Sequence, residues 1–105
     1  MSIRYLNQVE SAGSELIFDW DEGNRSHIAR HHVTPQEVEQ VLRNDPFDVG
    51  FEIVKGEQRW TALGHTNRWR ILMVVWTERR DAVRPVTVLM PPKALRKKYL
   101  ERVAH

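Results

Sequence analysis

The sequence predicts one α+β domain in which a mostly antiparallel sheet packs against two N-terminal helices and is followed by a short basic helix. Three observations predict this class. Most helix-capping signals and helically spaced apolar residues lie in the first half of the chain. Strand-like segments then follow one another over 47–89, and the turns between them are too short for parallel crossovers. The length of 105 residues allows a single domain, which we expect over 15–105 after a flexible arm at 1–14.

The first elements are expected to be a short strand and a helix. The segment ELIFD at 15–19 reads as the strand. Asp19 is then expected to cap a helix, with Glu22 three residues later as its capping-box partner. This helix should end at about His31.

The second helix has the clearest start signal in the chain. Thr34 is expected to be the cap, Pro35 the first helical residue and Glu37 the capping-box partner. We expect Asn44 to close the helix in a left-handed conformation, and Pro46 blocks its continuation. The apolar residues that share one helical face are Val38, Val41 and Leu42.

From residue 47 onward the apolar spacing changes from helical to alternating. Because 70–77 (RILMVVWT) is almost wholly apolar, it is expected to be a central strand. Pro85 cannot donate a hydrogen bond to a neighbouring strand, which favours an edge or a bulge there. The expected strands and the final helix span 47–54, 58–63, 70–77, 83–89 and 94–103.

The charge is distributed unevenly along the chain. Residues 1–54 hold 4 Lys/Arg against 10 Asp/Glu, a net charge of −6, whereas residues 55–105 hold 12 against 4, a net charge of +8. Such an asymmetry favours a polyanion partner such as nucleic acid for the basic half. The alternative is that the two halves neutralise each other within one fold.

Composition also narrows the class of protein. The absence of cysteine excludes a disulfide framework, a thiolate metal site and a cysteine nucleophile, and it is consistent with a reducing cytoplasm. The start of the chain lacks the apolar stretch of a secretory signal, and no apolar run approaches the roughly 20 residues that span a bilayer. We therefore expect a cytoplasmic protein without a membrane partner.

The first expected helix carries polar side chains on one face. Asn24, His27 and His31 recur at helical spacing there, so their side chains should lie together. Three roles are open for the histidines: ligands of a metal ion, members of a buried polar network, or proton carriers in RNA chemistry.

Arginines on neighbouring strands form the second candidate cluster. Arg59, Arg70 and Arg84 fall on three different expected strands, and a shared face would let them bind phosphates. Metal-free RNA cleavage needs such cations together with proton carriers, and the residues able to act as proton carriers are His27, His31, His65 and Tyr99. A solvated basic surface is the alternative. Among the tryptophans, Trp60 and Trp76 are expected in the core, and Trp69 is expected to be exposed.

Four segments of the chain resemble the BrnT-like toxins of type II toxin–antitoxin systems, in the RelE-like ribonuclease superfamily. They are WDEGNRSHIARHHVTPQEVEQVL, EQRWTALGHT, RILMVVWTERRDAVRPVTV and KKYLE, and the resemblance runs from Phe18 to Glu101. It implies a RelE-like fold and a metal-independent endoribonuclease that acts on mRNA, blocks translation and needs no cofactor. It also implies RNA as substrate and a small antitoxin, encoded nearby, as partner.

The resemblance and the basic clusters together define the candidate site. Characteristic family positions are occupied by Asn24, His27, His31, Arg59, Gly64, Arg84 and Tyr99. We expect the catalytic residues to be His27, His31, Arg59 and Arg84. The residues expected to bind RNA or phosphate are Asn24, Arg70, Lys93, Arg96 and Tyr99.

The chain departs from the family pattern at 87–90, where it reads TVLM and Leu89 replaces an arginine expected near the phosphate site. Three outcomes follow: a weak ribonuclease, an inactive relative that only binds nucleic acid or antitoxin, or an enzyme that uses Lys93 or Arg96 instead. A metal hydrolase built on His27 and His31 is the remaining hypothesis.

Overall fold

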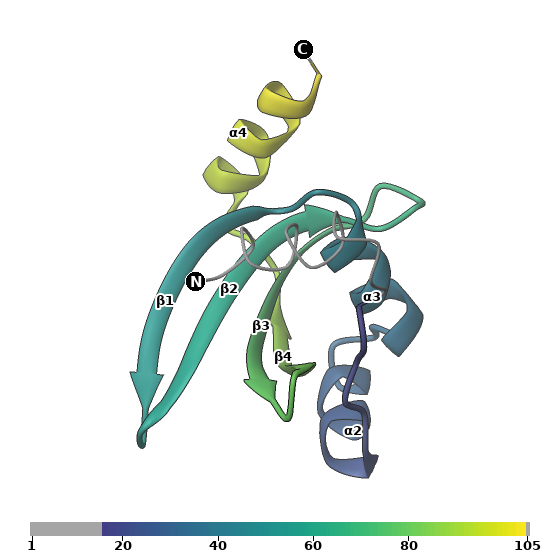
Figure 1. Cartoon of the computed structure of the whole chain (residues 1–105). Helices are drawn as coiled ribbons and strands as arrows, with labels where there is room; N and C mark the ends of the chain where they lie inside the picture. The colour runs from purple at the N-terminus through teal and green to yellow at the C-terminus, as the bar shows by residue number, and fades with distance from the viewer. Residues whose placement is uncertain (1–15, 105) are drawn as a thin grey trace.

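The computed structural model describes residues 16–104, which form three helices and one four-stranded sheet (Figure 1). Two helices precede the sheet and one follows it, so the predicted α+β class is confirmed. The expected arm at 1–14 lies outside the described residues. The elements, in chain order, are α2 (Glu22–Ala29), α3 (Pro35–Arg43), β1 (Phe47–Val54), β2 (Glu57–His65), β3 (Ile71–Arg79), β4 (Ala82–Leu89) and α4 (Lys93–Val103).

The sheet is antiparallel throughout, with its strands in the order β1-β2-β3-β4. Lys55 and Gly56 form the turn between β1 and β2, and Arg80 and Asp81 form the turn between β3 and β4. All four turn residues have positive φ, as two-residue hairpin turns require. The two hairpin tips therefore lie at one end of the sheet, and α4 lies at the other end (Figure 1).

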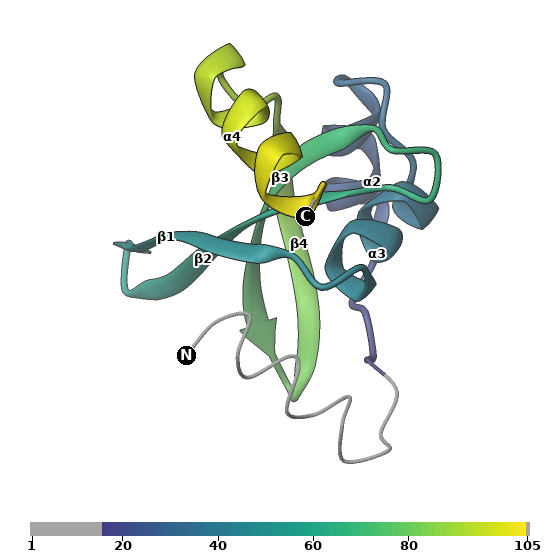
Figure 2. The same cartoon turned by 90° about the horizontal axis from the view of Figure 1, so that it is seen from above.

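One face of the sheet, here the core face, carries Trp60, Ala62, Val74 and Trp76, all buried in the main apolar cluster. The helices α2 and α3 supply the other half of this cluster, and both lie on the side of the molecule away from β1 (Figure 2). Trp60 and Trp76 stack with ring centroids 4.7 Å apart. The prediction that these two tryptophans belong to the core is confirmed.

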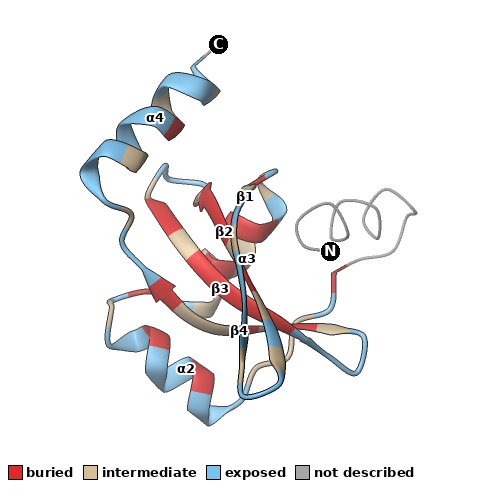
Figure 3. Ribbon diagram, turned by 90° about the vertical axis from the view of Figure 1, so that its left-hand side faces the viewer, coloured by how far each residue is buried: buried red, intermediate tan, exposed pale blue. Residues whose placement is uncertain are grey.

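The opposite face, here the site face, carries Arg59, Thr77 and Arg84, because side chains alternate along a strand and Thr77 is paired with Arg84. At its far end the site face carries Leu63 and Ile71, which form a second cluster with residues of α4. Most of α4 is exposed, as Figure 3 shows.

The expected strand at 15–19 is wrong. Phe18 forms only an isolated parallel bridge with Val83, although the N–H of Asp19 donates to the carbonyl of Val83 and the N–H of Val83 to the carbonyl of Ile17. Residue 15 is outside the described range. A local pattern could not show that this short segment is held by the edge of β4.

The expected bounds of the first helix are also wrong. Asp21, not Asp19, is the N-cap of α2, and its box partner is Asn24, not Glu22. The helix ends at Ala29 rather than near His31. The side-chain oxygen of Asn24 accepts a hydrogen bond from the N–H of Asp21, as the carboxylate of a glutamate does in a capping box.

The second helix follows the prediction at its start. Thr34 caps α3, Pro35 opens it and Glu37 completes the capping box. Its end differs, because Asn44 has φ −93° and the positive φ, 48°, belongs to Asp45. The left-handed residue therefore comes one position later than expected.

The strands confirm two further expectations. Strand β3 lies between β2 and β4, as its apolar sequence predicts. Pro85 lies in edge strand β4 opposite Trp76, where the register shifts between Val75 and Trp76. Within residues 16–104, none of the helices has the length and apolar character needed to cross a membrane.

Candidate functional site

A pocket of about 240 Å³ lies on the site face where α2 meets the hairpin end of the sheet. Its polar lining consists mainly of His27 from α2, Glu57 and Arg59 from β2, Thr77 and Arg79 from β3, and Arg84 from β4. Three of these six side chains are arginines from three different strands. The pocket is therefore rich in guanidinium hydrogen-bond donors.

Two of the three arginines were expected at the site, and Arg79 was not. Arg79 and Glu57 lie just outside the strands expected over 70–77 and 58–63, but β3 extends to Arg79 and β2 begins at Glu57. Alternation was the signal that could have found Arg79, since it follows Thr77 by two residues and so shares its face. The same spacing relates Glu57 to Arg59.

Glu57 lies between two of the arginines. Its Oε1 accepts a hydrogen bond of 2.8 Å from Nε of Arg59, and its Oε2 lies 3.8 Å from Nη2 of Arg79. The carboxylate of Glu57 thus holds Arg59 by a hydrogen bond, lies close to Arg79, and offsets part of the charge of both.

Arg84 is held by two carboxylates at the edge of the same pocket. Its Nη1 lies 3.0 Å from Oδ2 of Asp21 and 3.4 Å from Oδ2 of Asp19, and its Nη2 donates to Oδ1 of Asp21 at 3.2 Å. The hydrogen bond with Asp21 raises the pKa of Arg84 and holds the pKa of Asp21 below its usual 3.8. Arg84 is therefore charged, and its orientation is fixed by α2 and the segment before it.

Asn24 is buried beneath the pocket, and both the oxygen and the nitrogen of its side-chain amide form hydrogen bonds within the protein. Its Oδ1 accepts from the N–H of Asp21, and its Nδ2 donates to the carbonyls of Asp19 and Pro85, each at 2.9 Å. Asn24 was expected to bind RNA. The structure places it where it joins the start of α2 to the bulge of β4, and the RNA contact itself stays a prediction.

The two expected catalytic histidines lie close together. Their ring centroids are 6.2 Å apart. His27 is exposed and lines the pocket, whereas His31 follows the end of α2 and is half-buried. In the described part of the chain, no three His, Cys, Asp or Glu side chains gather closely enough to hold a metal ion.

Arg70 is not brought together with Arg59 and Arg84. Its Nη1 donates to the carbonyl of His32 at 2.6 Å and lies 3.3 Å from the Glu37 carboxylate. Arg70 therefore ties the start of β3 to α3 and the segment before it. The expectation that three arginines share one face is correct for Arg59 and Arg84 and wrong for Arg70.

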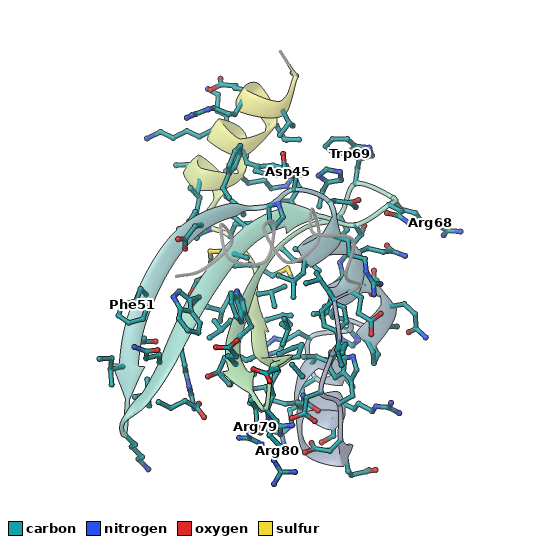
Figure 4. The ribbon with its side chains drawn as sticks, viewed as in Figure 1. Asp45, Phe51, Arg68, Trp69, Arg79 and Arg80 are labelled. Atoms are coloured by element: carbon teal, nitrogen blue, oxygen red, sulfur yellow. The ribbon has the colours of Figure 1, made fainter. Side chains whose placement is uncertain are left out.

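The expected RNA-binding residues of α4 lie at the other end of the sheet from the pocket. Tyr99 is buried in the cluster between α4 and the sheet, and its hydroxyl forms a 2.6 Å hydrogen bond with Nδ1 of His65. Lys93 and Arg96 are exposed on the first turns of the same helix. Figure 4 shows this separation, with Trp69 and Asp45 near α4 and Arg79 and Arg80 at the opposite end.

Leu89 also lies far from the pocket. It ends β4 opposite Met73, whereas Arg84 lies five residues earlier, about 17 Å away at roughly 3.4 Å per residue. Leu89 is 44% exposed. An arginine expected at this position would lie outside the pocket, so the presence of Leu89 leaves the charge of the pocket unchanged.

This arrangement is suited to phosphodiester chemistry. Three guanidinium groups supply donors and charge for a phosphate. The exposed imidazole of His27 at the pocket supplies a group that can accept or donate a proton.

Two comparisons with known proteins bear on this site. A family model described as the ribonuclease toxin, BrnT, of type II toxin–antitoxin systems matches residues 20–89. The matched range takes in every element from α2 to β4, and with them the whole pocket. No curated protein matches the chain.

Proposed function

The chain belongs to the BrnT family of ribonuclease toxins of type II toxin–antitoxin systems, and from this membership we propose that it is a metal-independent endoribonuclease that cleaves mRNA in the arginine pocket and so blocks translation. A single observation carries the proposal. Arg59, Arg79 and Arg84 converge from three strands on one pocket that also contains the exposed His27.

In the proposed reaction the 2′-hydroxyl of the RNA is the nucleophile. A base takes its proton, the 2′-oxygen attacks the neighbouring phosphorus, and the 5′-oxygen leaves with a proton from an acid. His27 is the proton carrier at the pocket, and His31, 6.2 Å from it between ring centroids, is the second. The arginines stabilise the additional negative charge on the phosphorane.

The carboxylates around the arginines position them for this task. Glu57 orients Arg59, and Asp21 orients Arg84, so these two guanidinium groups are ordered before RNA binds. Ordering in advance reduces the entropy lost when the phosphate is bound.

The position of Leu89 favours this reading over a module that only binds. If the lost arginine had belonged to the pocket, its loss would have removed a transition-state contact, which typically costs about 10²–10³ in rate. The pocket keeps its three arginines without it. A toxin of this type is paired with an antitoxin, and we propose that this antitoxin is encoded nearby and that both act in the cytoplasm.

Induced expression of the full chain in a bacterial host, with growth and total RNA followed together, tests the proposal. The unaltered chain should arrest growth and fragment RNA. Arg59→Ala combined with Arg84→Ala should abolish both effects, whereas Arg43→Ala, on α3 away from the pocket, should retain them. Circular dichroism of each purified variant checks that it folds.

Two results would contradict the proposal. The first is normal growth with abundant folded protein, and the second is undiminished toxicity of the folded double variant. Cleavage by the purified chain in excess EDTA separately tests metal independence, since a metal-dependent enzyme would stop.

A further inference from the structure

The turn between β2 and β3 presents an aromatic stack outside the proposed cleavage pocket. The rings of His65 and Trp69 lie parallel, with centroids 3.8 Å apart and an angle of 2° between their planes. Trp69 remains 52% exposed although one face of its indole is covered by His65. The other face of the indole is therefore directed to solvent.

Hydrogen bonds hold this stack in place. The backbone N–H of Trp69 donates to the carbonyl of Thr66. The buried Thr66 hydroxyl accepts from the backbone N–H groups of Arg68 and Arg70. The His65 ring is also held at its edge, where Nδ1 forms a 2.6 Å hydrogen bond with the hydroxyl of Tyr99. A ligand that stacks on Trp69 would meet a surface that is already ordered.

Folding alone does not account for the tryptophan at this position. Trp69 has φ +64°, a conformation that costs energy for a bulky residue and that clusters at functional sites. Trp69 is also outside the apolar cluster that joins α4 to the sheet, of which Tyr99 is a buried member. A half-exposed indole in a strained turn thus needs another explanation.

We propose that Trp69, backed by His65, is a stacking platform for an unpaired base of single-stranded RNA. This proposal rests on the proposed function and assigns the RNA a second point of contact. Every base has a flat π-face, and stacking on aromatic side chains is the usual way in which single-stranded nucleic acid is held without sequence readout.

The surrounding charge favours an anionic ligand over an apolar or basic protein segment, and among anionic ligands the flat face of Trp69 favours RNA, whose bases stack. Arg68 is the neighbour of Trp69 in the turn, and α4 at the same end holds five Lys/Arg against one Glu. Arg102 of α4 lies over the ring of Phe47, which contacts Tyr99 edge-on. Asp45 contributes a negative charge at this end of the sheet, close enough to act electrostatically on Tyr99. The net positive charge suits the phosphates on either side of a stacked base.

The platform also defines the class of substrate. Arg59 and His65 are six residues apart on β2, or about 20 Å at roughly 3.3 Å per residue. A strand that occupies the pocket and the platform together must therefore extend over several nucleotides. Because a base that stacks on Trp69 has to be unpaired, the substrate expected from this proposal is single-stranded at the platform.

The test measures binding of the full-length chain to a fluorescent, single-stranded 2′-O-methyl oligonucleotide, which lacks the reacting hydroxyl. Trp69→Ala should raise the Kd by about 5- to 150-fold, the range expected for loss of one stacked base. Trp69→Phe should restore most of the affinity. Phe51→Ala is the matched control, because Phe51 is an equally exposed aromatic (54%) on β1, and it should leave the Kd unchanged.

A second oligonucleotide of the same length, in which the bases are removed, separates stacking from phosphate binding. The effect of Trp69→Ala should disappear with this abasic strand. An unchanged Kd for folded Trp69→Ala, or an equal loss with the abasic strand, overturns the platform. It is also overturned if Trp69→Ala weakens only the complex with the antitoxin protein.

These results are distinguishable from failure of the proposed function. If the unaltered chain neither binds the oligonucleotide nor cleaves RNA, both proposals fail. If it cleaves RNA and Trp69→Ala binds as tightly as the unaltered chain, the platform alone fails.

Discussion

Arg84 of β4 and Asp21 at the start of α2 form a two-point ion pair, with 3.0 Å between Nη1 and Oδ2 and 3.2 Å between Nη2 and Oδ1. The same carboxylate accepts the capping hydrogen bond from the N–H of Asn24. Asp21 therefore has two roles, since it closes the first turn of the helix and neutralises an arginine of the pocket.

Serine at position 21 should separate these two roles. Asp21→Ser keeps an N-cap acceptor but removes the charge, so Arg84 should bind a phosphate more tightly while the midpoint of unfolding changes little. Asp21→Ala loses the cap as well and should unfold at a lower denaturant concentration. Urea unfolding and oligonucleotide affinity measure the two effects, and identical unfolding midpoints for both variants would contradict the capping role.

The buried amide of Asn24 should be essential for stability. Asn24→Ala leaves the N–H of Asp21 and two backbone carbonyls without their partner, and each buried group left unsatisfied costs about 1–3 kcal/mol. Loss of at least about 2 kcal/mol in the free energy of unfolding is expected. Ser26→Ala on the exposed side of the same helix is the control and should change little. Equal stability of the two variants would show that the amide is dispensable.

Gly64 should not tolerate a side chain. A Cβ at this position would lie 3.0 Å from Cβ of Pro46 and 3.1 Å from the backbone oxygen of Val41, so β2 and α3 would have to separate. Gly64→Ala should destabilise the fold by about 1–3 kcal/mol, as overpacking does. Gly50→Ala, whose Cβ would meet Thr61 at 3.4 Å, is the comparison and should cost clearly less. The same urea titration applied to both glycine variants measures the difference.

Stability should depend on pH through His65. Burial lowers the pKa of His65 below its usual 6.5. As the pH falls below 6.5, the His65 side chain is therefore protonated in the unfolded chain before it is protonated in the folded chain. The free energy of unfolding should fall as the pH drops from 6.5 to the lowered pKa, and this contribution should be constant above pH 6.5. His65→Gln should reduce this slope, whereas His32→Asn, at an exposed position, should keep it. Unfolding midpoints between pH 5 and 8 would decide, and an unaltered slope in His65→Gln would contradict the assignment.

The sequence was sufficient wherever the determinants are local. Thr34, Pro35 and Glu37 lie within four residues of one another, and together they specify the start of α3. The hairpins follow from alternation and from turns that need positive φ. The start of α2 was misplaced because Asp19 and Asp21 are equally good caps by sequence. Asn24, the capping-box partner of Asp21, donates to the carbonyl of Pro85, 61 residues later, and no local pattern shows that contact.

The same distinction applies to the site. Alternation and strand order bring Arg59 and Arg84 to one pocket, as predicted. Arg79 was missed through an error of only two residues in the end of β3. Arg70 was misplaced because its partner Glu37 lies 33 residues earlier, and no local pattern shows that pairing. The separation of α4 from the pocket depends on the length of the sheet, which the sequence alone does not specify.

The carboxylates beside the pocket arginines also determine how RNA binding should respond to ionic strength. A bare cation that binds a phosphate releases a condensed counterion from the nucleic acid, with a slope of about 0.7 per contact for single strands in a plot of log K against log salt. Arg59, Arg79 and Arg84 already face Glu57, Asp19 and Asp21, so a phosphate must displace an internal anion. The released carboxylates recruit cations from solution, which offsets part of the counterion release. The pocket should therefore contribute less to the salt slope than its three arginines suggest, and polyanions that do not fit it should gain little from those charges.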